Sequence, residues 1–192
     1  MAGRGGQGSG GDCAALEAAY GTLMRATVFL SSSLRVRSTG GRGGGDDLPH
    51  AGGAKVVGNG LRELDRFLCL LLDEAVGGIS PPTFDRAAFG RQRNAANKLR
   101  AFHRIAGLDA PDGERLRAIG RVRDCLHHCR GIVHDEAVHA DLHFASATPA
   151  SDRMSDTPRL SISFDALARI CQFYGETGTG LMQVLRDNPR IP

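Results

Sequence analysis

The densest group of chemically reactive side chains lies in residues 121–135. Four of them, Arg123, His127, Arg130 and His134, follow one another at steps of three or four residues, which is the spacing of a single helix face. A histidine can accept or donate a proton near neutral pH, and an arginine one turn away can stabilise charge on a phosphate group. The spacing predicts a site for phosphate chemistry. An ordinary polar helix face with salt bridges is the alternative.

A second pattern in this region has the residue types of a metal site. Asp135, His139 and His143 are four residues apart, so they would align on one side of a helix, and Cys125 and Cys129 have the same spacing. The histidine pair lacks the neighbouring glutamate of a metalloprotease helix, and the cysteines have helical rather than zinc-knuckle spacing. We therefore expect exposed histidines, core thiols, no metal and no cofactor, with a metal site on Asp135, His139 and His143 as the alternative.

The net charge of +3 is unevenly distributed along the chain. Residues 86–130 hold eleven basic and four acidic side chains, a local charge of +7 that favours a phosphate-rich partner. Aromatic residues make up only 5% of the chain and tryptophan is absent, which disfavours a base-stacking platform. We expect contacts to nucleic-acid phosphates, and the candidate residues are Arg93, Arg100, Arg104 and Arg123.

Apolar residues recur at helical spacing through most of the chain, which predicts an all-α bundle of four to five helices in one domain, residues 12–186. Asp12 and Ser163 have the residue types of helix N-caps. A short helix or turn is expected at 83–90, and residues 135–142 extend the fourth helix. The five main helices are expected at 13–37, 59–76, 92–106, 112–133 and 164–185.

Sixteen of the 26 glycines lie in the first 60 residues. This composition predicts a disordered tail at 1–11 and a flexible loop at 38–58, and a second short tail is expected at 187–192. Gly175, Gly178 and Gly180 predict a break in the last helix.

No segment resembles a secretory signal or a membrane span, and the five cysteines are scattered and odd in number. We therefore expect a cytoplasmic protein with free thiols.

The order of helices and the segment Arg130-Gly-Ile-Val-His134 resemble the HEPN superfamily of prokaryotic helical domains. In that superfamily an arginine, four to six residues and a histidine form the active site of metal-independent endoribonucleases, usually across a homodimer. The segment here has three intervening residues. The resemblance implies catalysis by Arg130 and His134, to which helical spacing adds His127. It also implies RNA as the partner, a toxin–antitoxin or defence role and a possible antitoxin.

A non-enzymatic interaction module is the alternative to this ribonuclease hypothesis. Its arginines would bind an acidic partner protein or nucleic acid without turnover. The two hypotheses differ in whether the Arg130 and His134 side chains converge at a cleft or a two-fold interface.

Overall fold

A computed structural model describes residues 9–38, 50–77, 84–109, 113–148 and 159–187. These residues form helices and no strand, which confirms the all-α class. The described residues contain seven helices, where four or five were expected. They are α1 (Ser9–Ser38), α2 (His50–Ala75), α3 (Arg86–Arg91), α4 (Ala95–Ala106), α5 (Gly113–His128), α6 (Ala137–Ser146) and α7 (Phe164–Asp187).

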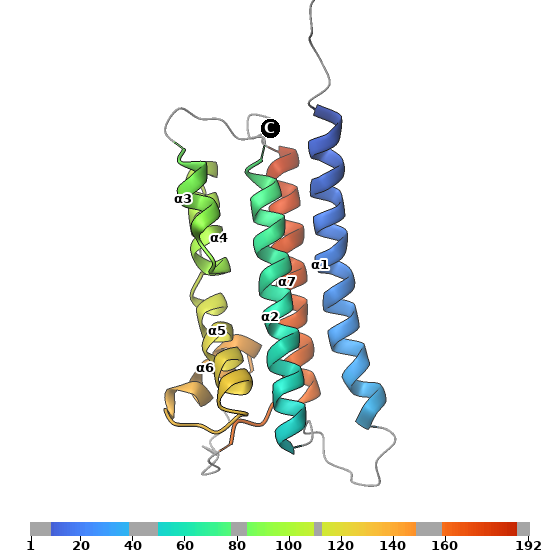
Figure 1. The fold of residues 1–192 in the computed structure, drawn as a ribbon, viewed down its shortest axis with the longest axis vertical. Helices are drawn as coiled ribbons and strands as arrows, with labels where there is room; N and C mark the ends of the chain where they lie inside the picture. The colour runs from blue at the N-terminus through green and yellow to red at the C-terminus, as the bar shows by residue number, and fades with distance from the viewer. Residues whose placement is uncertain (1–8, 39–49, 78–83, 110–112, 149–158, 188–192) are drawn as a thin grey trace, which may run out of the picture.

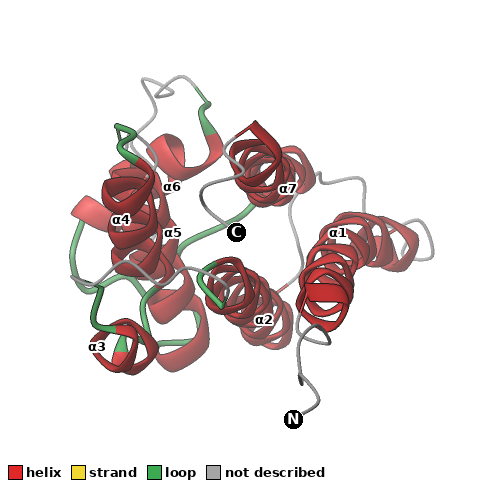
Figure 2. Ribbon diagram, turned by 90° about the horizontal axis from the view of Figure 1, so that it is seen from above, coloured by secondary structure: helices red, strands yellow, loops and turns green. Residues whose placement is uncertain are grey.

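Helix α2 is the centre of the fold. It packs against α1, α4, α5 and α7 (Figure 1). Viewed along the helices, α1 and α7 lie on one side of α2, and α3 to α6 lie on the other (Figure 2). The side of α2 that faces α4 and α5 can therefore contribute to a site shared by three helices.

The leucine-rich sequence of α2 explains its central position. Leu61, Leu64, Leu68, Leu71 and Leu72 recur at steps of three and four and are almost completely buried. Burial of each such side chain contributes about 2 kcal/mol from the hydrophobic effect. The remaining positions of the helix are left for polar side chains.

Several expected boundaries were wrong. Helix α1 begins at Ser9, so Asp12 lies inside the helix and is not its N-cap. Helix α2 begins at His50, so residues 50–58 of the expected flexible loop are helical. Residues 1–8, 39–49 and 188–192, where the remainder of the expected tails and loop fall, lie outside the described residues.

The expected break in α7 was also wrong, because the helix is continuous from Phe164 to Asp187. A Cβ atom at Gly178 would lie 2.8 Å from Leu23 Cδ2, and one at Gly175 would lie 3.6 Å from the end of Met24. The first of these distances is too short for a side chain, so Gly178 allows α1 to approach α7 closely, and tertiary packing overrides its low helix propensity. The N-cap prediction for this helix is confirmed, because the Ala166 amide donates to Ser163 Oγ at 3.1 Å.

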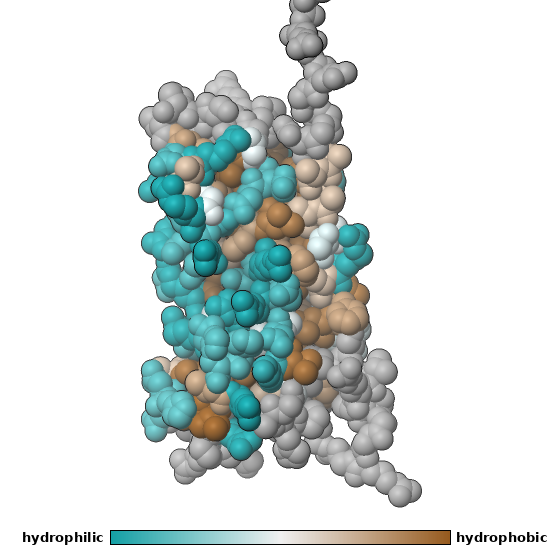
Figure 3. Space-filling model, in the orientation of Figure 1, coloured by the Kyte–Doolittle hydropathy of each residue, from teal (hydrophilic) through white to brown (hydrophobic). Residues whose placement is uncertain are grey.

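Polar residues cover much of the face over α3, α4 and α5, and apolar residues are more frequent toward α1 (Figure 3). On α1, Val28 and Phe29 are 64% and 70% exposed. Among the described helices, none has the length and apolar character needed for a membrane span.

Candidate functional site

The end of α5 determines which predicted residues can act together. The helix ends at His128, and Arg130 takes a left-handed conformation with φ 52°. Gly131 follows with φ 78°, and its amide donates to the Cys125 carbonyl at 3.0 Å. The same carbonyl accepts from the Cys129 amide at 3.0 Å, so the left-handed turn at Arg130 and Gly131 closes back onto the last turn of α5.

Arg130 and His134 therefore do not continue the polar face of α5, as the spacing had predicted. Arg130 lies in the closing turn and His134 in the segment before α6, and both are exposed. Within the described residues, no hydrogen bond or ion pair joins them to each other or to the rest of the chain. Their part in catalysis stays a prediction that the helix geometry does not support.

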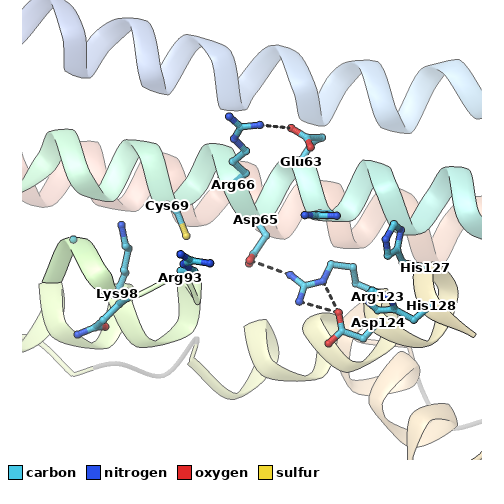
Figure 4. Close-up of a pocket in the computed structure, with 13 residues that line it drawn as sticks. Glu63, Asp65, Arg66, Cys69, Arg93, Lys98, Arg123, Asp124, His127 and His128 are labelled. Carbon is cyan, nitrogen blue, oxygen red and sulfur yellow. Dashed lines mark hydrogen bonds and ion pairs between the residues drawn. The ribbon is translucent and has the colours of Figure 1, made fainter. Parts of the chain in front are cut away.

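His127 and Arg123 instead face a cleft of about 630 Å³ between α2, the α3–α4 connection and α5 (Figure 4). The cleft is lined mainly by charged and polar side chains. They are Arg62, Glu63, Asp65, Arg66, Cys69, Gln92, Arg93, Lys98, Arg123, Asp124, His127 and His128, together with Gly90.

Local structure explains how Arg93 reaches this cleft. The next residue, Asn94, is the N-cap of α4, and its Oδ1 accepts from the Ala96 amide at 2.8 Å. The helix ends at Gly107, as expected, in a left-handed C-cap with φ 68°. Arg93 is thus held at the start of α4, beside the cleft.

The basic residues of the cleft differ in their pairing. Lys98 is buried and binds Asp73 at 2.5 Å, and Arg66 lies 3.8 Å from Glu63. In contrast, neither Arg62 nor Arg93 forms an ion pair within the described ranges. These two guanidinium groups are available to an anion.

Arg123 has two carboxylate partners. Its Nη1 donates to Asp65 Oδ2 at 3.0 Å, and its Nε donates to Asp124 Oδ1 at 3.0 Å. The Tyr174 hydroxyl donates to the second Asp65 oxygen at 3.5 Å. Burial raises the pKa of Asp65, although Arg123 and Tyr174 act in the opposite direction. Burial opposes the charged form of Arg123, but Asp65 and Asp124 hold its pKa above the ordinary value.

Two histidines occupy the last turn of α5. The rings of His127 and His128 meet edge to face with centroids 4.5 Å apart. His127 Nδ1 is buried and has no hydrogen-bond partner in the described structure. Desolvation, followed by the charges of His128, Arg62 and Lys55, lowers the pKa of His127, so the neutral imidazole is favoured.

The other predicted nucleic-acid contacts lie outside this cleft. Arg100 and Arg104 are exposed on α4, and Arg100 donates to Asn97 Oδ1 at 2.7 Å. Only Arg93 and Arg123 of the four predicted arginines line the cleft. Whether Arg100 and Arg104 bind nucleic acid stays a prediction.

The alternative metal pattern is not assembled. Asp135 precedes α6 and accepts from the Ala137 amide at 3.0 Å, and His143 Nδ1 lies 3.4 Å from Thr148 Oγ1. In the part of the chain that the structure describes, no three histidine, cysteine or acidic side chains are grouped as metal ligands would be.

All five cysteines are free: Cys125 and Cys171 are buried, Cys69 and Cys129 are partly buried, and Cys13 is exposed. Burial raises the pKa of Cys69 to about 12, so this cleft thiol is not an activated nucleophile.

Sequence reasoning missed several cleft residues. One of them is His128, which follows Arg123 after four intervening residues. This separation is within the arginine–histidine spacing of the HEPN superfamily, so the signal was present at Arg123 rather than at Arg130. Arg62 and Arg66 are one helical turn apart on α2, but they lie outside residues 86–130, where the basic side chains are concentrated.

Comparisons with protein families, with curated proteins and with solved structures found no match to this chain.

Proposed function

We propose that the protein binds RNA in the cleft between α2 and α5. One observation carries this proposal: basic side chains from α2, the α3–α4 connection, α4 and α5 face the same cavity, and two of them, Arg62 and Arg93, lack carboxylate partners within the described structure. Such a convergence of cations favours a phosphate-bearing ligand. The resemblance to the HEPN superfamily assigns that ligand to RNA.

The lining supports contacts to the RNA backbone rather than to stacked bases. It contains no phenylalanine or tyrosine. Arginine contacts to phosphates are insensitive to sequence and weaken as salt increases. Binding is therefore expected to depend little on base sequence.

Cleavage of the bound RNA is a second candidate function, and the Arg123–His128 spacing favours it. In this proposal the neutral His127 imidazole accepts the proton of a ribose 2′-hydroxyl, whose oxygen attacks the adjacent phosphorus. His128 gives a proton to the departing 5′ oxygen, and the arginines stabilise the charged phosphorane. The products are a 2′,3′-cyclic phosphate and a 5′-hydroxyl, and no metal takes part.

We also propose a homodimer of a toxin–antitoxin or defence system, which is what the same resemblance implies, and a cytoplasmic location, which rests on the sequence pattern and the free cysteines. Sedimentation of the purified chain tests the dimer. Co-purification from its own host tests the antitoxin.

Binding is tested with the full chain and a short fluorescent single-stranded RNA in EDTA, followed by anisotropy. Arg62→Ala and Arg93→Ala are each expected to weaken binding about fivefold, the effect of losing one phosphate contact. Arg169→Ala is the matched control, because Arg169 is paired with Asp165 on α7 and lies outside the cleft. Equal losses in all three variants, or no binding by the wild type, would contradict the proposal.

Cleavage is tested on the same RNA by resolving the product ends. His128→Ala is expected to abolish cleavage while retaining binding. Full cleavage by this variant would refute the assignment of His128. Binding by the wild type without any cleavage would instead establish the non-enzymatic alternative.

A further inference from the structure

Asp65 and Arg123 form an ion pair in the cleft, and both side chains are largely buried. Asp65 comes from α2 and Arg123 from α5, and their side chains are only 16% and 22% exposed. Removing two charges from water is costly, and a buried pair often stabilises a fold no better than apolar residues of the same size. Stability alone therefore gives a weak reason for a carboxylate at this position.

The second carboxylate on Arg123 is not equivalent. Asp124 is the next residue in the chain, and its side chain is 56% exposed. Water screens an exposed pair of this kind, which typically contributes little. Asp65 is thus the partner that fixes the guanidinium across the cleft.

Asp65 is itself held from behind. Tyr174, on α7, is 1% exposed, and its hydroxyl donates to Asp65 Oδ1 at 3.5 Å, the oxygen that Arg123 Nη1 does not contact. The result is a chain of contacts from the core through a carboxylate to an arginine at the cleft surface. A side chain held in this way loses little further conformational freedom when a ligand binds.

We propose that Asp65, held by Tyr174, is a positioning residue that orients Arg123 toward a phosphate group of the RNA. This inference rests on the proposed function, since it names how one residue of the same cleft is prepared for its ligand. Asp65 does not contact the RNA and acts through Arg123.

The direction in which Asp65→Asn changes the affinity for RNA separates a positioning role from a simple charge effect. Asp65→Asn removes a negative charge from a cleft that binds a polyanion, so a purely electrostatic effect would strengthen binding. Loss of orientation would weaken it. We expect about fivefold weaker binding, which lies within the range of interaction energies typical of two residues in contact.

The experiment is a double-mutant cycle measured by RNA anisotropy. Arg123→Ala should weaken binding, and Asp65→Asn should cause no further loss when Arg123 is already absent. Asp165→Asn is the matched control, because it also removes one exposed carboxylate but lies on α7 outside the cleft, and it should bind as tightly as the wild type. Circular dichroism and thermal unfolding confirm that each variant is folded.

Two further variants keep the test decisive if Asp65→Asn does not fold. Tyr174→Phe retains the ring but frees the carboxylate, and about twofold weaker binding is expected, at the low end of the same range of interaction energies. Asp65→Glu keeps the charge and should recover part of the affinity.

The outcomes are distinguishable. If the wild type binds RNA and Asp65→Asn binds it equally or more tightly, the positioning role alone is overturned. If Asp65→Asn is unfolded, the same result for Tyr174→Phe overturns that role. A loss of the same size in the Arg123→Ala background would also overturn it. No RNA binding by the wild type would overturn the proposed function and this inference with it.

Discussion

Gly58 on α2 lies directly against the backbone of His127 on α5. A Cβ atom at residue 58 would be 2.8 Å from the His127 nitrogen and 3.1 Å from its Cα. The obstacle is main chain, which cannot rotate away as a side chain can. The absence of a side chain at residue 58 therefore sets how closely the two walls of the cleft approach.

Gly58→Ala is expected to lower the free energy of unfolding by about 1–3 kcal/mol, because α2 and α5 must separate to admit the methyl group. The same separation displaces His127 and should weaken RNA binding. Gly53→Ala on the same helix is the control, because nothing lies within 4 Å of its added Cβ. Gly53→Ala should stabilise the helix by about 0.5–1 kcal/mol. Denaturant unfolding of both variants measures the difference, and equal stability would show that α5 tolerates the shift.

The pKa of His127 provides a second prediction. Desolvation and the nearby charges of His128, Arg62 and Lys55 lower this pKa, against a smaller opposing effect of Asp124. A ¹³C- or ¹⁵N-detected NMR titration should therefore give a pKa for His127 below 6.5. Removing one positive charge with Arg62→Ala should raise it toward the ordinary value.

Arg169→Ala, which removes a charge outside the cleft, should leave the His127 titration unchanged. If His127 is the general base, the acid limb of the cleavage rate should follow the same pKa below 6.5. A wild-type value at or above 6.5 would mean that the surrounding charges do not act on this ring.

The sequence predicted the fold class and missed the geometry of the site for identifiable reasons. Leucine periodicity located α2 because Leu61, Leu64, Leu68 and Leu71 are buried on one stripe. The end of α5 was misplaced by five residues because Arg130 adopts a left-handed conformation that is uncommon for a side chain of this type. A helix continued to residue 133 would have placed Arg130 and His134 on the same face as Arg123 and His127, and the turn at Arg130 prevents this.

The α2 side of the cleft could not be deduced from local pattern. Asp65 and Arg123 are 58 residues apart, and only the packing of α2 on α5 brings them together. Spacing rules describe one helix at a time, so the residues that α2 contributes to the cleft required the tertiary structure.

The salt dependence of RNA binding is a third prediction. Each phosphate contact that is lost should make the logarithmic salt dependence less steep by about one counterion. Arg93→Ala should show this change because Arg93 lines the cleft. Arg169→Ala, which removes an arginine of α7 outside the cleft, is the matched control and should leave the slope unchanged. Parallel slopes for the wild type and Arg93→Ala would place the binding surface elsewhere.

Asp65 makes the stability of the fold depend on pH in a defined direction. Its pKa in the folded protein is raised above the ordinary value of 3.8, chiefly by burial. The folded state then holds the proton more tightly than the unfolded state in the interval above pH 3.8. The contribution of Asp65 to stability is thus greatest at low pH and decreases as pH rises through its folded pKa.

Comparison with Asp65→Asn isolates this contribution, because every other titrating group is shared. The free energy of unfolding of the wild type minus that of the variant should fall as pH rises from 3.8. Urea unfolding across a pH series gives both values. An increase instead would mean that attraction to Arg123 exceeds the effect of burial on Asp65.

The glycines of α7 give a last prediction, because they occupy one helix in different surroundings. Gly180 has nothing within 4 Å of an added Cβ, whereas Gly178 would place that atom 2.8 Å from Leu23 Cδ2. Leu23 is fully buried, so its side chain has little room to move. Gly180→Ala should raise the free energy of unfolding by about 0.5–1 kcal/mol through helix propensity. Gly178→Ala should lower it by about 1–2 kcal/mol through overpacking against α1. Thermal and denaturant unfolding of the two variants test whether α7 is limited by helix propensity or by contact with α1, and stabilisation by both would rule out the close α1–α7 contact.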